Sequence, residues 1–124
     1  MLRILSILPF LFVTPASAQG LSAEAYAKQT QAIATRVQQQ LMACWSVPAG
    51  EEGQRLGLDI VFFGDGRLDG EAALSPQTEK RASKREALRE SVLRAVRSCV
   101  PFEGLEALGA GADERFSVTI IFQS

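Results

Sequence analysis

The fold is decided by a stretch near the middle of the chain, LGLDIVFFGDG, which occupies positions 56–66. Four apolar residues alternate with their neighbours in this stretch, and they are Leu56, Leu58, Ile60 and Phe62. Alternation gives a β-strand one apolar face, because successive side chains point to opposite faces of a sheet. The Asp65-Gly66 pair is a hairpin signal, since glycine adopts the positive φ that tight turns require. We therefore expect a strand, a turn, and a weaker returning strand over 67–74.

The end of the chain contains the clearest strand of all. Its apolar residues alternate with Ser117, Thr119 and Ile121, and they are Phe116, Val118, Ile120 and Phe122. The same rule of alternation predicts a strand over 115–122 with one firmly apolar face.

Two other segments have the spacing of amphipathic helices. The first begins at Ser22, a suitable N-cap, and its apolar residues are Tyr26, Ile33, Val37, Leu41, Cys44 and Trp45. The second ends before Pro101 and has two alternative starts. One is Ser75-Pro76, with proline at the first helical position, and the other is a capping box of Ser83 with Glu86. Its apolar residues are Leu88, Val92, Ala95, Val96 and Cys99.

The elements therefore follow in the order helix, hairpin, helix, strand. Each helix has a single apolar stripe, so both helices should pack on the same face of the sheet. We expect a two-layer α+β domain with a three-stranded antiparallel sheet and two helices on one face.

The first 18 residues have the organisation of a cleaved export signal. Arg3 precedes an apolar run over 4–13, and Ala16-Ser17-Ala18 has the small-x-small pattern of a signal-peptidase site. The run is about half of the roughly 20 residues that a spanning helix needs, and no later apolar stretch is long enough to span a membrane. Cleavage after Ala18 predicts a periplasmic protein of one domain, without a membrane span.

The composition argues against several classes of function. Without Arg3 the chain has 12 basic and 14 acidic residues, a balance that argues against nucleic-acid binding. The chain has no histidine, so Ser-His-Asp, Cys-His and histidine-ligated zinc sites are excluded. We expect no enzyme activity, no catalytic residue, no metal site and no cofactor.

Cys44 and Cys99 are the two cysteines of the chain, and each lies at the end of a helical stretch. Thiols oxidise outside the cytoplasm, so an exported chain with two cysteines favours one structural disulfide between them. A redox pair is the alternative, but no CxxC motif supports it. Two buried free thiols would remain if the export signal were not functional.

Four pieces of the sequence together resemble a known family. They are Cys44-Trp45-x-x-Pro48, Leu58-x-Ile60 leading to Asp65-Gly66-x-Leu68, Leu93-x-Ala95-Val96-x-x-Cys99-x-Pro101-Phe102, and Phe116-x-Val118-Thr119-Ile120. In this order they resemble the periplasmic C-terminal domain of TolA and, more broadly, TonB C-terminal domains. The resemblance runs from about Ala32 to Phe122. It divides the chain into a signal peptide (1–18), a lead-in with the start of the first helix (19–31) and a domain (32–124), with no membrane anchor or long linker.

The resemblance implies a cell-envelope module that binds a partner protein, and a role connected with transport. Its partner would be a periplasmic or outer-membrane protein, of the Tol–Pal or a TonB-type system, bound as an extended peptide beside an edge strand. The expected partner-binding residues are Phe116, Ser117, Val118, Thr119, Ile120 and Ile121, with Val61 and Phe63 beside them. These residues also give the sheet a partly apolar outer face.

Several alternatives stay open at this point. The chain could be a structural envelope protein that pairs edge to edge as a homodimer, or a small periplasmic ligand carrier or enzyme. The second helix is basic through Lys80, Arg81, Lys84, Arg85, Arg89, Arg94 and Arg97, which form either a solvated face or a docking surface for an acidic partner or anionic lipid. Trp45 either covers the disulfide and the helix end or serves as an exposed anchor.

Overall fold

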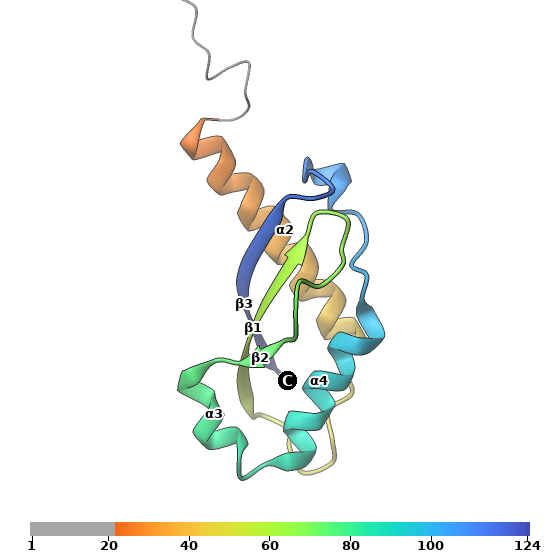
Figure 1. Cartoon of the computed structure of the whole chain (residues 1–124). Coiled ribbons are helices and arrows are strands. Elements are labelled where there is room, and N and C mark those ends of the chain that lie inside the picture. Colours follow the sequence, from red (N-terminus) through yellow and green to blue (C-terminus); the bar gives the residue numbers. More distant parts are fainter. Residues whose placement is uncertain (1–21) are drawn as a thin grey trace, which may run out of the picture.

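The computed structural model describes residues 22–124, so the signal peptide expected over residues 1–18 lies outside the described part of the chain. The described elements follow in the order α2 (Ala23–Cys44), β1 (Arg55–Phe63), β2 (Ala73–Leu74), α3 (Pro76–Ala82), α4 (Glu86–Cys99), the 3₁₀ turn η1 (Glu106–Leu108) and β3 (Arg115–Gln123) (Figure 1).

The three strands form one antiparallel sheet with the order β2-β1-β3. β1 and β3 pair along their whole length, from Arg55 opposite Gln123 to Phe63 opposite Arg115. β2 pairs with β1 over two residues only. The fold class expected from the sequence, an α+β domain with a three-stranded antiparallel sheet, is confirmed.

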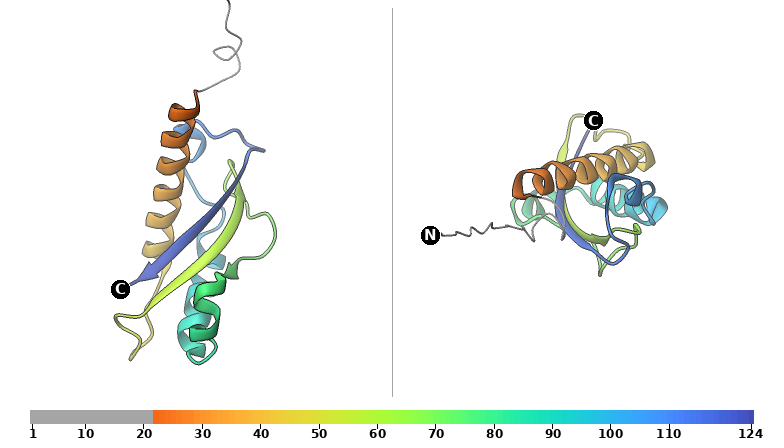
Figure 2. Two further views of the ribbon diagram at one scale, coloured as in Figure 1. Left: turned by 90° about the vertical axis from the view of Figure 1, so that its left-hand side faces the viewer. Right: turned by 90° about the horizontal axis from the view of Figure 1, so that it is seen from above.

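One face of the sheet carries the core. The buried residues of β1 are joined there by Ile33, Val37 and Leu41 of α2 and by Leu88 and Val92 of α4. From above, α2 and α4 lie together over the sheet (Figure 2). These are the apolar stripes that the helical spacing indicated, and they bury against the alternating residues of the strands because neither surface could otherwise leave water.

The turn after β1 forms where the Asp65-Gly66 pair predicted it. The N–H of Gly66 donates to the carbonyl of Phe63, and the N–H of Phe63 donates to the carbonyl of Arg67, each over 2.8 Å. Gly66 has a φ of 95°, a value that costs a residue with a side chain more than it costs glycine. The sequence signal was therefore correct about the turn.

The returning strand expected over 67–74 is much shorter than the sequence indicated. Leu68 forms an isolated bridge with Phe62, and regular pairing resumes only where Leu74 lies opposite Leu58. Between these two points the returning arm has two more residues than β1, so it leaves the ladder as a bulge. The weakness that the sequence indicated for this strand is therefore pronounced, and only Ala73–Leu74 pairs as a regular strand.

The second helical segment is two helices, so both alternative starts were partly correct. α3 begins after Ser75 with Pro76 at its first position, and it ends at Ala82. α4 begins at Glu86, but the capping box of Ser83 with Glu86 does not form. The hydroxyl of Ser83 instead donates to the carbonyl of Lys80, within the last turn of α3.

In the left view of Figure 2 the long strands cross between α2 on one side and α3 on the other.

Candidate functional site

β3 is an edge strand of the sheet, since β1 is its only neighbour among the described strands. On β1, Gly57 and Val61 use their carbonyls toward the β2 side, where they accept from Ser75 and Asp69. Hydrogen-bonding direction alternates along an antiparallel strand, so the even-numbered residues of β1 bond to β3. In the β1–β3 register this leaves the N–H and C=O groups of Ser117, Thr119 and Ile121 facing away from β1. The edge therefore offers backbone donors and acceptors at regular spacing.

The sequence-predicted site residues of β3 divide between its two faces. Phe116 and Ile120 are buried in the core, with exposed fractions of 3% and 1%, and Val118 is half-buried on the same face. These three side chains hold the strand against the helices. Ser117 and Thr119 are exposed and Ile121 is half-buried on the outer face. The side chains that a partner would meet first are therefore those of the second set.

Val61 and Phe63 lie on the outer face of β1, opposite Ser117 and Arg115. Both are half-buried rather than bare. The guanidinium of Arg67 lies over the ring of Phe63 at 4.6 Å from its centroid, and Arg115 pairs with Asp69 over 2.5 Å close by. Charged side chains thus cover part of the apolar outer face that the sequence indicated, and Val61 and Phe63 stay secondary candidates.

The carboxyl group of Asp65 lies in the turn at the same end of the sheet. Asp65 accepts from the backbone N–H of Arg67 over 3.0 Å and from its Nε over 2.6 Å. These hydrogen bonds from Arg67, the backbone one first, lower the pKa of Asp65 below its usual value. The two hydrogen bonds hold the turn and the guanidinium of Arg67 in place.

Two grooves flank the free edge. On the core side, a groove of about 340 Å³ separates α2 from β3, and it is lined by Gln31, Ala34, Thr35, Gln38, Gln39, Thr119 and Ile120. On the outer side, a hollow of about 420 Å³ lies between α3 and β3, and it includes Arg55, Arg81, Thr119 and Ile121. A strand added to β3 would present alternate side chains to these two grooves.

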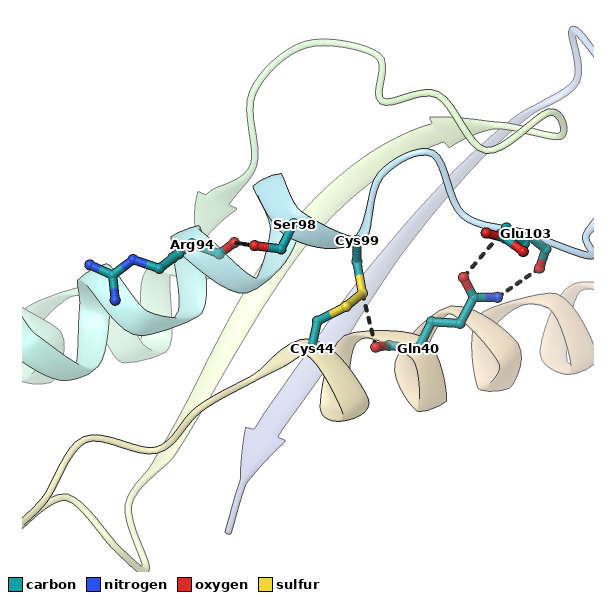
Figure 3. Close-up of a disulfide and its surroundings, with 6 residues drawn as sticks. All are labelled: Gln40, Cys44, Arg94, Ser98, Cys99 and Glu103. Atoms are coloured by element: carbon teal, nitrogen blue, oxygen red, sulfur yellow. Dashed lines mark hydrogen bonds between the residues drawn. A yellow bond between two sulfur atoms is a disulfide. The ribbon is translucent and has the colours of Figure 1, made fainter.

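The disulfide fixes the helix that flanks the edge. Cys44 at the end of α2 is bonded to Cys99 at the end of α4, with the two Cα atoms 6.1 Å apart (Figure 3). The pairing expected from the sequence is confirmed. The Sγ of Cys99 also lies 3.0 Å from the carbonyl oxygen of Gln40, a contact in which the disulfide sulfur has no hydrogen to donate.

The side-chain amide of Gln40 adds a second tie between α2 and the segment after α4. Its Nε2 donates to the carbonyl of Glu103 over 2.6 Å, and its Oε1 accepts from the N–H of Glu103 over 2.9 Å (Figure 3). At the other end of α2, Gln29 donates to the carbonyl of Leu108. α2 is therefore held at both ends, and the groove beside β3 has a fixed wall.

The other sequence candidates contribute less to a site. Trp45 is half-buried, donates to the hydroxyl of Ser91 over 2.9 Å and packs edge-on against Phe122, so the structure favours the covering role over the exposed anchor. The basic residues divide among α3, α4 and their connection, and Arg85 pairs with Glu51 over 2.9 Å.

Within residues 22–124, no group of three or more metal-ligating side chains comes together. No helix of this part of the chain is both long and apolar enough to cross a membrane.

Sequence reasoning missed the residues that wall the two grooves. The sequence patterns single out none of the residues Gln31, Thr35, Gln38 and Arg55. The helical spacing does show which residues of the helix face away from the core. Nothing in the sequence shows that this polar surface lies against the β3 edge, because that depends on how the helix crosses the sheet.

A family model described as Uncharacterised conserved protein UCP034077 matches residues 27–124, which include every described strand and most of the first helix. No curated protein matches the chain. No solved structure matches it either.

Proposed function

The chain belongs to that family, UCP034077, and we propose that it is a protein-interaction module of the cell envelope which binds an extended segment of a partner along β3. One observation carries this proposal: the backbone groups of Ser117, Thr119 and Ile121 face away from the sheet on an edge strand that is paired along its whole other side. An extended segment of a second protein can use such groups for β-augmentation.

The neighbouring geometry supports the same reading. A bare edge invites unspecific aggregation, and native proteins usually shield one. Here the edge runs between two grooves with different linings, so a guest strand would be received in one orientation of its faces. Backbone pairing would provide affinity, and the grooves would provide selectivity among side chains.

The disulfide supports a periplasmic location, because disulfides persist in oxidising compartments and are rare in the cytosol. The resemblance to TolA and TonB C-terminal domains supports an envelope partner of the Tol–Pal or a TonB-type system. In this proposal the chain has no catalytic role, and the export signal over residues 1–18 takes it to the partner.

The proposal is tested by photo-crosslinking in envelope extracts. A photo-reactive residue replaces Thr119, and a matched control places the same residue at Ser98, which is exposed near the end of α4. We expect one envelope protein to be captured from position 119 and not from position 98. Equal capture from both positions, or from neither, would contradict binding along β3.

A second candidate uses the same observation. Two copies of the chain could pair through their β3 edges as an antiparallel homodimer. Sedimentation of the purified chain distinguishes the two, because a homodimer loses its dimer mass when Thr119→Pro blocks the edge. If the natural chain and Thr119→Pro are both monomeric, the homodimer is ruled out and the edge is available to another protein.

A further inference from the structure

The outer hollow beside β3 contains two guanidinium groups. Arg55 begins β1 and lies opposite Gln123 of β3, and Arg81 comes from the last turn of α3. Both side chains are exposed, and both line the hollow together with Thr119 and Ile121 of the edge strand. Two cations from different elements are thus brought to the same side of the free edge.

Neither of these two arginines has a carboxylate partner among residues 22–124. The arginines at the opposite end of the sheet differ in this respect, since Arg67 pairs with Asp65 and Asp113, and Arg115 pairs with Asp69. No acidic side chain lines the hollow. The positive charge of Arg55 and Arg81 therefore has no carboxylate beside it in the hollow, and the Asp59 carboxylate that accepts from Thr119 lies further along the same face.

The floor of the hollow depends on a glycine. A Cβ built on Gly57 would lie 2.6 Å from the Oγ of Ser75 and 3.7 Å from the Cδ1 of Ile121. The carbonyl of Gly57 also accepts from the hydroxyl of Thr78, over 3.1 Å. The absence of a side chain at this position leaves room between α3 and the edge strand. A larger residue would fill that room.

The opposite flank of the edge has a different character. The α2 residues that line the groove on the core side are glutamines, a threonine and an alanine, and none carries a charge. Amide side chains accept and donate hydrogen bonds but give no preference for an ion. The two flanks of the edge therefore differ in charge, with cations on the α3 side and neutral polar groups on the α2 side.

We propose that the partner of this chain is an acidic extended segment, with Asp or Glu at the alternate positions that face α3 and uncharged residues at the positions that face α2. This inference rests on the proposed function, since it assumes that the segment pairs with β3. Side chains of a strand alternate between faces, so acidic residues two positions apart would all reach the hollow.

The distances allow such contacts. Neighbouring strands lie about 4.8 Å apart, so a guest strand stands next to Thr119 and Ile121 and one strand further from Arg55. The contact with Arg55 therefore spans two strand spacings, about 10 Å, and requires the extended arginine side chain to lie across the outer face of β3. The planar guanidinium binds a carboxylate with two parallel N–H donors, which makes arginine more selective for this partner than lysine.

The experiment selects peptides from a displayed library of random sequences as long as β3, which has nine residues. The full chain is panned in parallel with Thr119→Pro, Arg55→Gln/Arg81→Gln and the control Arg94→Gln. Arg94 is exposed on α4 and lines neither groove, so Arg94→Gln removes one positive charge, half of what the double variant removes, without touching the edge. Ser117→Pro serves as a second block of the edge if Thr119→Pro does not fold.

The expected result is enrichment of Asp or Glu at positions two apart, which disappears for Arg55→Gln/Arg81→Gln and persists for Arg94→Gln. A selected peptide should bind about tenfold more weakly when its carboxylates are replaced by amides, and the amide peptide should lose nothing further on the double variant. Raised salt should weaken the acidic peptide more than the amide peptide.

Two other outcomes overturn the inference in distinguishable ways. Peptides that lose binding on Thr119→Pro but show no acidic preference would refute the acidic partner and leave binding along β3 in place. Peptides that bind Thr119→Pro as well as they bind the natural chain, or a library without any enrichment, would refute both proposals.

Discussion

The hydroxyl of Thr119 donates to the Oδ1 of Asp59 over 2.6 Å, across the outer face of the β1–β3 pair. The two residues lie directly opposite each other in the register, at a position where the backbones do not bond and side chains come closest. This hydrogen bond links the side chains of β1 and β3 on the outer face, at the centre of the proposed binding edge.

The first prediction concerns this pair. Thr119→Val keeps the backbone N–H and removes the hydroxyl, so it should lower the free energy of unfolding by about 1 kcal/mol. Asp59→Ala should cost a similar amount, and the double variant should cost less than the two single costs together. Urea denaturation of the four proteins measures this coupling. Strict additivity would show that the hydrogen bond does not contribute to stability.

The second prediction concerns the disulfide. Cys44 and Cys99 are separated by 55 positions, and the chain-entropy account assigns about 4 kcal/mol to a loop of this length. Cys44→Ser/Cys99→Ser should therefore unfold at a much lower urea concentration than the natural chain. Reduction of the natural chain with dithiothreitol is the matched control and should give a comparable loss. Unchanged stability in both would contradict a structural role.

The third prediction concerns Asp65 in the hairpin turn. Hydrogen bonds from Arg67 lower its pKa in the folded state below the usual 3.8, so the carboxylate stabilises the fold above that pH. This contribution is lost as the pH falls through the folded-state pKa, because the unfolded chain then binds the proton more readily. Asp65→Asn should be less stable than the natural chain near neutral pH.

The pH dependence provides the check on Asp65. The stability difference between the natural chain and Asp65→Asn should shrink on acidification, and thermal melts from about pH 7 to about pH 2 follow it. Asp113→Asn is a suitable control, because its carboxylate lies 3.5 Å from Arg67, is 92% exposed and makes no backbone contact. A difference that stays constant with pH would rule out the titration of Asp65 as its cause.

The fourth prediction concerns Gly57. Gly57→Ala places a Cβ 2.6 Å from the Oγ of Ser75, so one of the two must move, at a cost of about 1–3 kcal/mol. Gly57→Ala/Ser75→Ala removes that oxygen and should recover part of the loss. Chemical denaturation of the natural chain and the two variants measures the recovery. A double variant that is less stable than Gly57→Ala would mean that the contact with Ser75 is not the source of strain.

Local patterns were sufficient for most of the elements. Leu56, Leu58 and Ile60 indicated a strand by alternation, and the same residues are buried in β1. Ile33, Val37 and Leu41 indicated a helix by their spacing, and they form the buried stripe of α2. Such patterns are readable because burial selects side chains with the period of each element.

Local sequence patterns were insufficient to predict the start of α4 and the length of β2. The capping box of Ser83 with Glu86 matches a helix start, yet Ser83 ends α3 and bonds to Lys80. The segment between Leu68 and Ala73 has strand-forming neighbours, yet it bulges out of the ladder. The bulge follows from the register of β2 on β1, whereas Ser83 is held by its own hydrogen bond to Lys80 three residues earlier.

The candidate site shows the same division. Sequence reasoning placed partner binding on residues 116–121 as a whole, whereas the register separates Ser117, Thr119 and Ile121 at the edge from Phe116 and Ile120 in the core. The hollow with Arg55 and Arg81 could not be anticipated, because these residues come from different elements and meet only across the sheet.

The sequence by itself determined the two long strands, the apolar stripes of the two long helices, the turn at Gly66 and the layering, because each depends on local periodicity and on the removal of apolar surface from water. The disulfide partner was also determined, since only two cysteines exist. Only the tertiary structure decided that β3 lies at an edge, that its odd-numbered backbone groups face outward, and that cations flank one side and amides the other. Strand order, register and the crossing of helices over the sheet set these features, and they arise from contacts between residues far apart along the chain.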